Sequence, residues 1–236
     1  MDTAIEGKLS SVSFFCPAYH DEKNLPVLIP RVHAFLSEIA HRFEIVIVED
    51  GSPDTTGEAA DALAARYKEV RVIHHPKNLG YGGAIRDGFL NSRLDYVMYT
   101  DGDNQYDPRE FEAALPLLRE ADVVSGYVRE KAVSDLRKLQ STIFNLMVAV
   151  LFFVWIRDIN CSMKIYKRKV LDAIEIKSMS AFIDAEMLVC ARRAGFRIAQ
   201  FPVTHFRRTE GLPSGSKLAV IVPTIMDMLK FRFGLL

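Results

Sequence analysis

The sequence has few cysteines and no excess of charge of either sign. Its three cysteines, Cys16, Cys161 and Cys190, are odd in number and far apart, which argues against a disulfide framework and against a cysteine-based zinc site. Lys and Arg together number 30, as do Asp and Glu, so the net charge is zero. Because nucleic-acid-binding domains are usually basic, we expect no nucleic-acid partner.

Signal regions and membrane-spanning runs are also missing. Residues 1–6 have neither a basic start nor an apolar signal segment, so we expect a cytoplasmic protein. Residues 143–156 are apolar except for Asn145. As a helix they would span roughly 21 Å, which is short of the ~30 Å hydrocarbon layer of a bilayer. This run is more typical of a core or interfacial helix.

What the sequence does contain is an alternation of strand and helix patterns. Apolar β-prone runs predict strands at residues 12–16, 44–48, 70–74, 94–100 and 121–126. Helical spacing predicts helices between them, at residues 24–41, 55–67, 82–91 and 108–120. Pro26 and Pro30 are expected to confine the first helix to its later turns. The alternation predicts an α/β fold with a mainly parallel, Rossmann-like sheet flanked by helices.

After about residue 128 the alternation stops. A long apolar helix and mixed elements come first, followed by a helix at 182–194, a strand at 197–203 and a C-terminal helix at 218–236. There is no linker or repeat, so we predict a single domain over residues 1–236. In the last helix Thr224, Asp227 and Lys230 form a narrow polar stripe. That pattern suits a helix at a membrane surface, on the domain or against a second subunit.

Two carboxylates, Asp101 and Asp103, follow the fourth predicted strand with one glycine between them. Ligands gather at the carboxyl ends of strands in open α/β sheets, and paired carboxylates there suit a divalent cation that also binds phosphates. Residues 101, 103, 105, 107 and 112 also match the spacing of an EF-hand calcium loop. Tyr106 occupies the glycine position of that loop, however, and a strand precedes it. A plain turn is the remaining alternative.

Polar clusters follow the other predicted strands as well. They comprise residues 17–22, 49–55 and 75–86. An aromatic ring can stack on a base, a carboxylate can accept from a ribose hydroxyl, and a glycine-rich turn lets backbone approach a ligand. A Walker A loop is absent, and the dinucleotide fingerprint that begins at Gly80 fails at Ile85. The clusters therefore favour a metal–diphosphate site of another kind.

Several ordered motifs together resemble a known family. They are Pro17-Ala-Tyr19, Glu49-Asp50-Gly51-Ser52, the glycine-rich segment 78–84, Asp101-Gly-Asp103-Asn-Gln105, segment 158–164 and the basic residues of 205–217. Over residues 12–217 the chain is similar to family 2 glycosyltransferases with the GT-A fold. Within that family it resembles the branch of dolichyl-phosphate mannose synthase and related polyprenyl-phosphate glycosyltransferases.

The resemblance implies a reaction and a division of labour along the chain. The reaction is an inverting transfer of a hexose, mannose or glucose, from a GDP- or UDP-linked sugar to a polyprenyl or dolichyl phosphate. Residues 12–128 would bind the nucleotide sugar and residues 129–217 the acceptor. The protein would be peripheral, on the cytoplasmic face of a membrane.

The resemblance also implies individual roles. Base and ribose would be held by Pro17, Tyr19, Asp21, Val48 and Asp50. Mg²⁺ or Mn²⁺ would be bound by Asp101, Asp103 and Gln105, with the two aspartates bridging to the diphosphate. The donor diphosphate or the acceptor phosphate would be faced by Arg129, Arg208 and Lys217.

The acceptor decides whether a general base is needed. A phosphate monoester is largely a dianion at neutral pH, because its second pKa is near 6, whereas a sugar hydroxyl needs a base. Asp184 and Glu186 are the candidates, with Asp184 preferred, although a spacing of two places them on different helix faces. Acidic residues also favour a helix N-terminus without any catalytic role. A transferase for glycan or small-molecule hydroxyls and a nucleotide-sugar-binding module without turnover both remain open.

Overall fold

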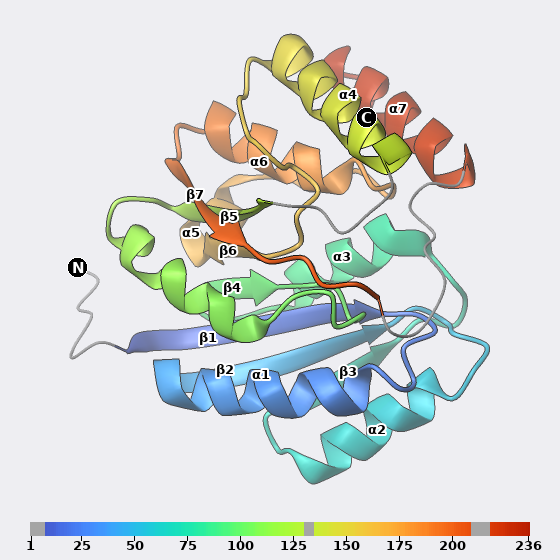
Figure 1. The fold of residues 1–236 in the computed structure, drawn as a ribbon, viewed down its shortest axis with the longest axis vertical. Helices are drawn as coiled ribbons and strands as arrows, with labels where there is room; N and C mark the ends of the chain where they lie inside the picture. The colour runs from blue at the N-terminus through green and yellow to red at the C-terminus, as the bar shows by residue number, and fades with distance from the viewer. Residues whose placement is uncertain (1–7, 130–134, 209–217) are drawn as a thin grey trace.

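A computed structural model describes residues 8–129, 135–208 and 218–236, and a seven-stranded sheet forms its centre (Figure 1). The strands are β1 (Leu9–Ala18), β2 (Ala40–Glu49), β3 (Val70–His74), β4 (Tyr96–Tyr99), β5 (Val123–Val128), β6 (Lys164–Lys167) and β7 (Ile198–Val203). Their spatial order is β3-β2-β1-β4-β6-β5-β7. All neighbours are parallel except β6, which runs antiparallel to β4 and β5. The prediction of a mainly parallel sheet is confirmed.

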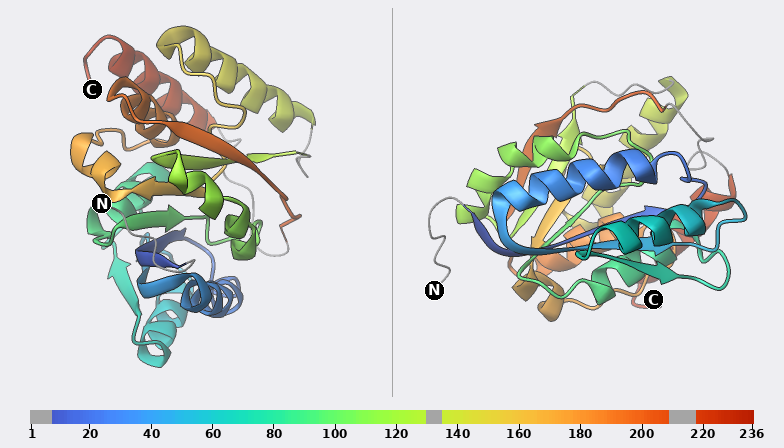
Figure 2. Two further views of the ribbon diagram at one scale, coloured as in Figure 1. Left: turned by 90° about the vertical axis from the view of Figure 1, so that its left-hand side faces the viewer. Right: turned by 90° about the horizontal axis from the view of Figure 1, so that it is seen from below.

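Helices cover both faces of this sheet (Figure 2). They are α1 (Leu25–Ile39), α2 (Thr56–Arg66), α3 (Gly80–Asn91), α4 (Asp135–Phe152), α5 (Arg168–Ala173), α6 (Ile183–Arg193) and α7 (Leu218–Arg232). In β2, Ile45 and Ile47 pack in the core layer of α1, whereas Val46 and Val48 pack in the layer of α3 and α6. Burial on both faces is the reason that this strand reads as a continuous apolar run.

The first helix corrects the prediction drawn from its prolines. α1 begins at Leu25, so Pro26 lies in its first turn, where a missing N–H costs no helical bond. Pro30 lies inside the helix and removes one hydrogen bond, at a cost of about 3 kcal/mol. Burial offsets this cost, since each fully buried aliphatic or Phe side chain contributes about 1.5–3 kcal/mol. The buried side chains are Leu25, Leu28, Ile29, Val32, Phe35, Leu36 and Ile39.

The α-helix predicted for residues 108–120 is wrong. The segment instead forms two short 3₁₀ helices, η1 (Pro108–Ala113) and η2 (Leu115–Arg119). Pro116 has no N–H to donate to the carbonyl of Glu112, and it disfavours helical backbone at Leu115. A continuous α-helix therefore cannot pass through this point without losing a bond.

Strand β6 was not predicted, because its four residues read only as mixed structure. Lys164, its first residue, is fully buried although it is charged. The alternation of polar and apolar residues that usually reveals a strand is therefore missing. Since β6 is antiparallel, Lys164 pairs with Tyr99, the last residue of β4. The start of β6 therefore lies at the same edge as the carboxyl ends of the parallel strands.

Gly82 provides a test of how closely α3 packs against the loop before α6. A Cβ at Gly82 would lie 2.3 Å from the carbonyl of Met179, in the loop before α6. We expect Gly82→Ala to lower the free energy of unfolding by about 1–3 kcal/mol, because backbone must be displaced. Gly57→Ala in α2 is the matched control, since its new Cβ would approach no atom closer than 3.7 Å. Urea denaturation measures both, and equal losses in the two variants would contradict this packing.

Candidate functional site

The polar clusters that follow β1, β2 and β4 meet at one edge of the sheet, as predicted. The Asp50 N–H donates to the Ala18 carbonyl at 3.0 Å, which ties the end of β2 to that of β1. A Cβ on Gly102 would lie 2.6 Å from the Pro17 carbonyl oxygen. The loop after β4 can approach β1 this closely because residue 102 has no side chain.

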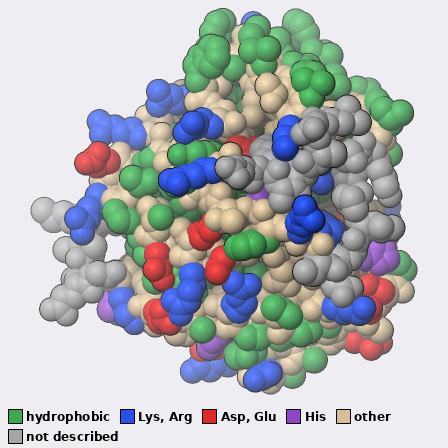
Figure 3. Space-filling model, in the orientation of Figure 1, with side chains coloured by type: hydrophobic (Ala, Val, Ile, Leu, Met, Phe, Trp, Pro, Cys, Tyr) green, Lys and Arg blue, Asp and Glu red, His purple; other side chains and the backbone are tan. Residues whose placement is uncertain are grey.

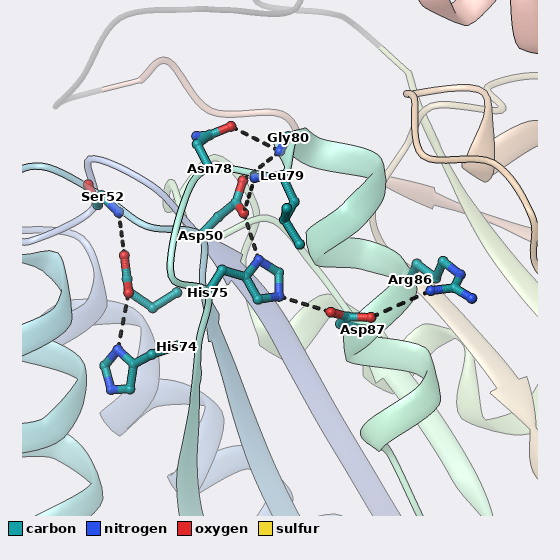
Figure 4. A network of polar contacts seen from close by, with 10 residues as sticks. Asp50, Ser52, His74, His75, Asn78, Leu79, Gly80, Arg86 and Asp87 are labelled. Atoms are coloured by element: carbon teal, nitrogen blue, oxygen red, sulfur yellow. Dashed lines mark hydrogen bonds and ion pairs between the residues drawn. The ribbon is translucent and has the colours of Figure 1, made fainter.

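Asp50 organises the turn that begins α3 (Figure 4). Its Oδ1 accepts from the Leu79 N–H at 2.8 Å and lies 2.7 Å from His75 Nδ1, while its Oδ2 accepts from the Gly80 N–H at 2.9 Å. Gly80 has a φ of 81°, a left-handed conformation that suits glycine. Both oxygens of Asp50 are therefore engaged within the protein. Its contact with base or ribose stays a prediction.

The other residues expected to bind the base lie in the loop after β1 and near the ends of β1 and β2. Tyr19 is 42% exposed, so its ring is accessible for stacking. Asp21 is buried and accepts from the Tyr19 N–H at 3.0 Å and from Asn24 Nδ2 at 2.8 Å; burial raises the pKa of this carboxyl above its ordinary value. Val48 is fully buried, so its contact with a base stays a prediction. Pro17 lies beside Val48 in the β1–β2 register.

Asp101 carries a buried oxygen without a partner. Its Oδ1 is enclosed and forms no hydrogen bond, which is a costly state for a carboxylate. Burial, together with the negative charges of Asp103 and Asp184, raises the pKa of Asp101 to about 7. A divalent cation would supply the missing positive partner, and carboxylate oxygens are ligands that Mg²⁺ and Mn²⁺ favour. The geometry at Asp101 therefore fits a cation.

Asp103 and Gln105 hold the segment after β7 against their own loop, the one that follows β4. Arg208 Nη2 donates to Asp103 Oδ2. Gln105 Nε2 donates to the Phe206 carbonyl at 3.0 Å, and the Phe206 N–H donates to the Gln105 carbonyl at 2.9 Å. The fold thus brings together Asp103, Gln105 and Arg208, three predicted site residues, across a sequence separation of 105 positions.

Two carboxylates and one amide do not make a complete metal cage. Among residues 8–129, 135–208 and 218–236, no three His, Cys, Asp or Glu side chains converge on a common point. A cation held by Asp101 and Asp103 would therefore keep positions for water and phosphate oxygens, as Mg²⁺ commonly does.

Asp184, the preferred candidate base, is buried in a network that sequence reasoning missed. Its Oδ1 accepts from Lys164 Nζ at 2.5 Å and from the Tyr99 hydroxyl, and its Oδ2 accepts from the Tyr81 hydroxyl at 3.0 Å. The signal in the sequence was Lys164, a lysine flanked directly by apolar residues rather than placed in a polar segment. The catalytic role of Asp184 stays a prediction.

Glu186 is fully buried as well. It accepts from the backbone N–H groups of Lys177 and Ser178 at 3.0 and 2.9 Å, which fixes the loop before α6. Burial raises its pKa. These contacts give Glu186 a structural role in the described part of the chain.

Arg129 and Lys217 are the remaining predicted residues. Arg129 is exposed just beyond β5, beside Pro202 of β7 and Glu110 of η1. Lys217 lies outside the described residues. The roles predicted for both stay predictions.

Residues 13–175 match the model of Glycosyl transferase family 2. The chain belongs to this family. Glycosyltransferase AglD of Haloferax volcanii is 34% identical over 229 residues, which are 92% of this chain and 35% of that protein. Dodecaprenyl-phosphate galacturonate synthase of Rhizobium johnstonii is 28% identical over 94% of this chain and 66% of its own length. The chain therefore spans between a third and two thirds of these two relatives.

A third relative and a solved structure extend the comparison. Dolichyl-phosphate beta-glucosyltransferase ALG5D of Trichomonas vaginalis is 28% identical over 93% of this family 2 chain and 72% of its own length. Glucosyl-3-phosphoglycerate synthase of Mycobacterium tuberculosis, solved with Mn²⁺, UDP and phosphoglyceric acid, has a TM-score of 0.73 at 17% identity. The structural alignment covers 96% of this chain and 80% of the solved one. The predicted GT-A fold is confirmed.

The described helices of this family 2 chain include none that is both long enough and apolar enough to cross a bilayer.

Asp50 and Asp61 form a matched pair for testing the turn before α3. We expect Asp50→Asn to cost about 1–3 kcal/mol of unfolding free energy, because an amide NH₂ would face backbone N–H donors. Asp61 contacts His74, but its side chain is 65% exposed, so Asp61→Asn should stay within about 0.5 kcal/mol of the wild type. Urea denaturation reports both values. An Asp50→Asn protein as stable as Asp61→Asn would show that Asp50 does not hold the turn.

Proposed function

We propose that the chain is an inverting glycosyltransferase that moves a hexose from a nucleotide-diphosphate sugar to a polyprenyl phosphate. The observation that carries the proposal is the acidic end of β4. There Asp101 has a buried oxygen without a partner, and Asp103 lies against the Arg208 guanidinium. This arrangement suits a cation and an anionic diphosphate together. The printed names of two relatives, a dodecaprenyl-phosphate and a dolichyl-phosphate enzyme, support the choice of acceptor.

On the donor side, side chains of the protein would bind the cation and neutralise the negative charge of the diphosphate. Asp101, Asp103 and Gln105 would hold Mg²⁺ or Mn²⁺, which when bound stabilises negative charge on the leaving diphosphate. When the donor binds, the Arg208 guanidinium would give up its hydrogen bond to Asp103 and donate to a diphosphate oxygen instead. Such charge-assisted hydrogen bonds are strong. The exposed Tyr19 ring would stack on the base.

On the acceptor side, the buried state of both candidate bases favours a phosphate. Asp184 and Glu186 are 3% and 0% exposed, and their oxygens already accept hydrogen bonds from the protein. A phosphate dianion can attack the anomeric carbon without losing a proton. Attack from the side opposite the leaving diphosphate inverts that carbon.

Replacing both aspartates tests the donor site. We expect Asp101→Asn with Asp103→Asn to lower kcat/KM for transfer at least about 100-fold, because several kcal/mol of charge stabilisation are lost. Asp172→Asn, at an exposed position on α5, is the control and should match the wild type. The assay follows sugar transfer from UDP- and GDP-hexoses to a polyprenyl phosphate with Mn²⁺. Undiminished transfer by the double variant would refute the proposal.

We further propose that the enzyme docks on a membrane through α4 and α7. The two helices lie side by side (Figure 1), and Phe152 of α4 packs on Phe231 of α7 with ring centroids 5.7 Å apart. Their outward-facing side chains are apolar and gather over these helices at the top of Figure 3. The exposed side chains, 42% to 81% accessible, are Leu139, Ile143, Leu146, Val150, Phe153, Trp155, Leu218, Val222, Met226, Leu229, Phe233 and Leu235.

Thr224 and Asp227, two of the three residues in the polar stripe of α7, face the domain, the reverse of a helix on a water-exposed surface. Thr224 is buried, and Asp227 Oδ2 accepts from the Ser178 hydroxyl at 3.0 Å. Exposed Arg157, Lys230 and Arg232 lie close to the apolar residues in sequence. Exposed apolar side chains with neighbouring cations match an interfacial anchor, and anionic lipid attracts such cations.

Vesicle binding tests this docking face. Leu146→Ser with Met226→Ser should weaken binding to anionic phospholipid vesicles at least about tenfold, because a buried aliphatic or Met side chain contributes about 1.5–3 kcal/mol. The control is Val27→Ser on α1, where a valine is 51% exposed outside this face. Co-sedimentation measures the bound fraction. Equal binding by the two variants, or no binding by the wild type, would contradict the proposal.

A further inference from the structure

A fully buried lysine, Lys164, lies beside the end of β4, which the Asp101–Asp103 loop follows. Lys164 is 0% exposed, and its Nζ lies 2.5 Å from Asp184 Oδ1 and 2.9 Å from the Tyr99 hydroxyl. Asp184 is itself only 3% exposed. A buried ammonium is costly unless an anion is close by, and Asp184 is the anion that this one contacts.

The pair is located where it can act on Asp101. Lys164 is paired in the antiparallel register with Tyr99, which stands two residues before Asp101. Ser162, two residues before Lys164, accepts from the Asp101 N–H at 3.2 Å. The charge of Lys164 lowers the pKa of Asp101 and that of Asp184 raises it, so both lie within electrostatic reach of the carboxylate.

Asp101 and Lys164 are therefore potential partners that the structure keeps apart. Asp101 Oδ1 lacks a hydrogen-bond donor, and Lys164 has a flexible four-carbon stem that ends in a compact charge. The ammonium is instead directed to Asp184. The Tyr81 hydroxyl, 3.0 Å from Asp184 Oδ2, restrains the second oxygen of that carboxylate.

We propose that Asp184 is a positioning residue whose carboxylate holds the Lys164 ammonium away from Asp101 and so keeps Asp101 Oδ1 open to a divalent cation. The inference rests on the proposed function, since it presumes a cation–diphosphate site at Asp101. It assigns Asp184 a role different from that of a general base. Removing Asp184 alone would release the ammonium toward Asp101 and weaken cation binding, whereas removing both charges would restore it.

A double-mutant cycle with Lys164→Met separates these roles. Calorimetry measures the binding of UDP and of GDP to the full chain at a series of Mn²⁺ concentrations. We expect Asp184→Asn to raise the Mn²⁺ concentration required for half-maximal nucleotide affinity at least about tenfold, because one unit of positive charge is left uncompensated near the site. Asp184→Asn with Lys164→Met should return to within about threefold of the wild type, because paired buried charges can be replaced by uncharged groups.

The opposite outcomes overturn the inference. A general base would lower the transfer rate at saturating Mn²⁺ while leaving the Mn²⁺ requirement unchanged, and Lys164→Met would not rescue it. A purely structural role would make the double variant at least as defective as Asp184→Asn. If Asp184→Asn fails to fold, the double variant still tests the proposal. A Mn²⁺ requirement of the double variant more than tenfold above that of the wild type would contradict it.

Failure of the proposed function has a separate signature. A wild-type protein that binds neither UDP nor GDP in a Mn²⁺-dependent manner would overturn that function and this inference with it. Wild-type binding combined with an unchanged Mn²⁺ requirement in Asp184→Asn would overturn the inference alone.

Discussion

The structure of the site depends on negative charge that is concentrated at the end of one short strand. Asp101, Asp103 and Asp184 lie within electrostatic reach of one another, and burial raises the pKa of Asp101 to about 7. Carboxylates in such surroundings require positive partners. Lys164 and Arg208 supply two, on Asp184 and Asp103 respectively. The remaining oxygen, on Asp101, is the point where we place a cation.

The compensating cations come from the second half of the chain, so the two halves form one site. Lys164 reaches the strand end because β6 runs antiparallel to β4, and Arg208 reaches it from the segment after β7. The network around Asp184 joins α3, β4, β6 and α6 through side chains. The residues predicted to bind the donor and the elements predicted to bind the acceptor are thus linked by side-chain contacts and by charge.

Helices α4 and α7 add a surface that the donor site alone would not require. Their inner faces pack through Phe152 and Phe231, which contact each other and Phe182 at the start of α6, while the apolar outer faces are left exposed. Exposed apolar patches of this kind mark interaction surfaces in soluble domains. An acceptor with a polyprenyl tail would reside in a membrane, which gives the exposed face and the proposed reaction a common setting.

The sequence by itself determined the mainly parallel sheet and the strand ends that carry the candidate site, because hydrophobic periodicity and turn residues are local signals. Its ordered motifs carried the resemblance to the family. The sequence also located Asp101, Asp103 and Arg208, although not the pairing between them. Only the tertiary structure decided that β6 is antiparallel, that Asp50 is occupied by the turn before α3, that Asp184 holds a buried lysine, and that Thr224 and Asp227 of α7 face the domain. The physical reason is that each of these depends on contacts between residues far apart in the chain, which local patterns do not encode.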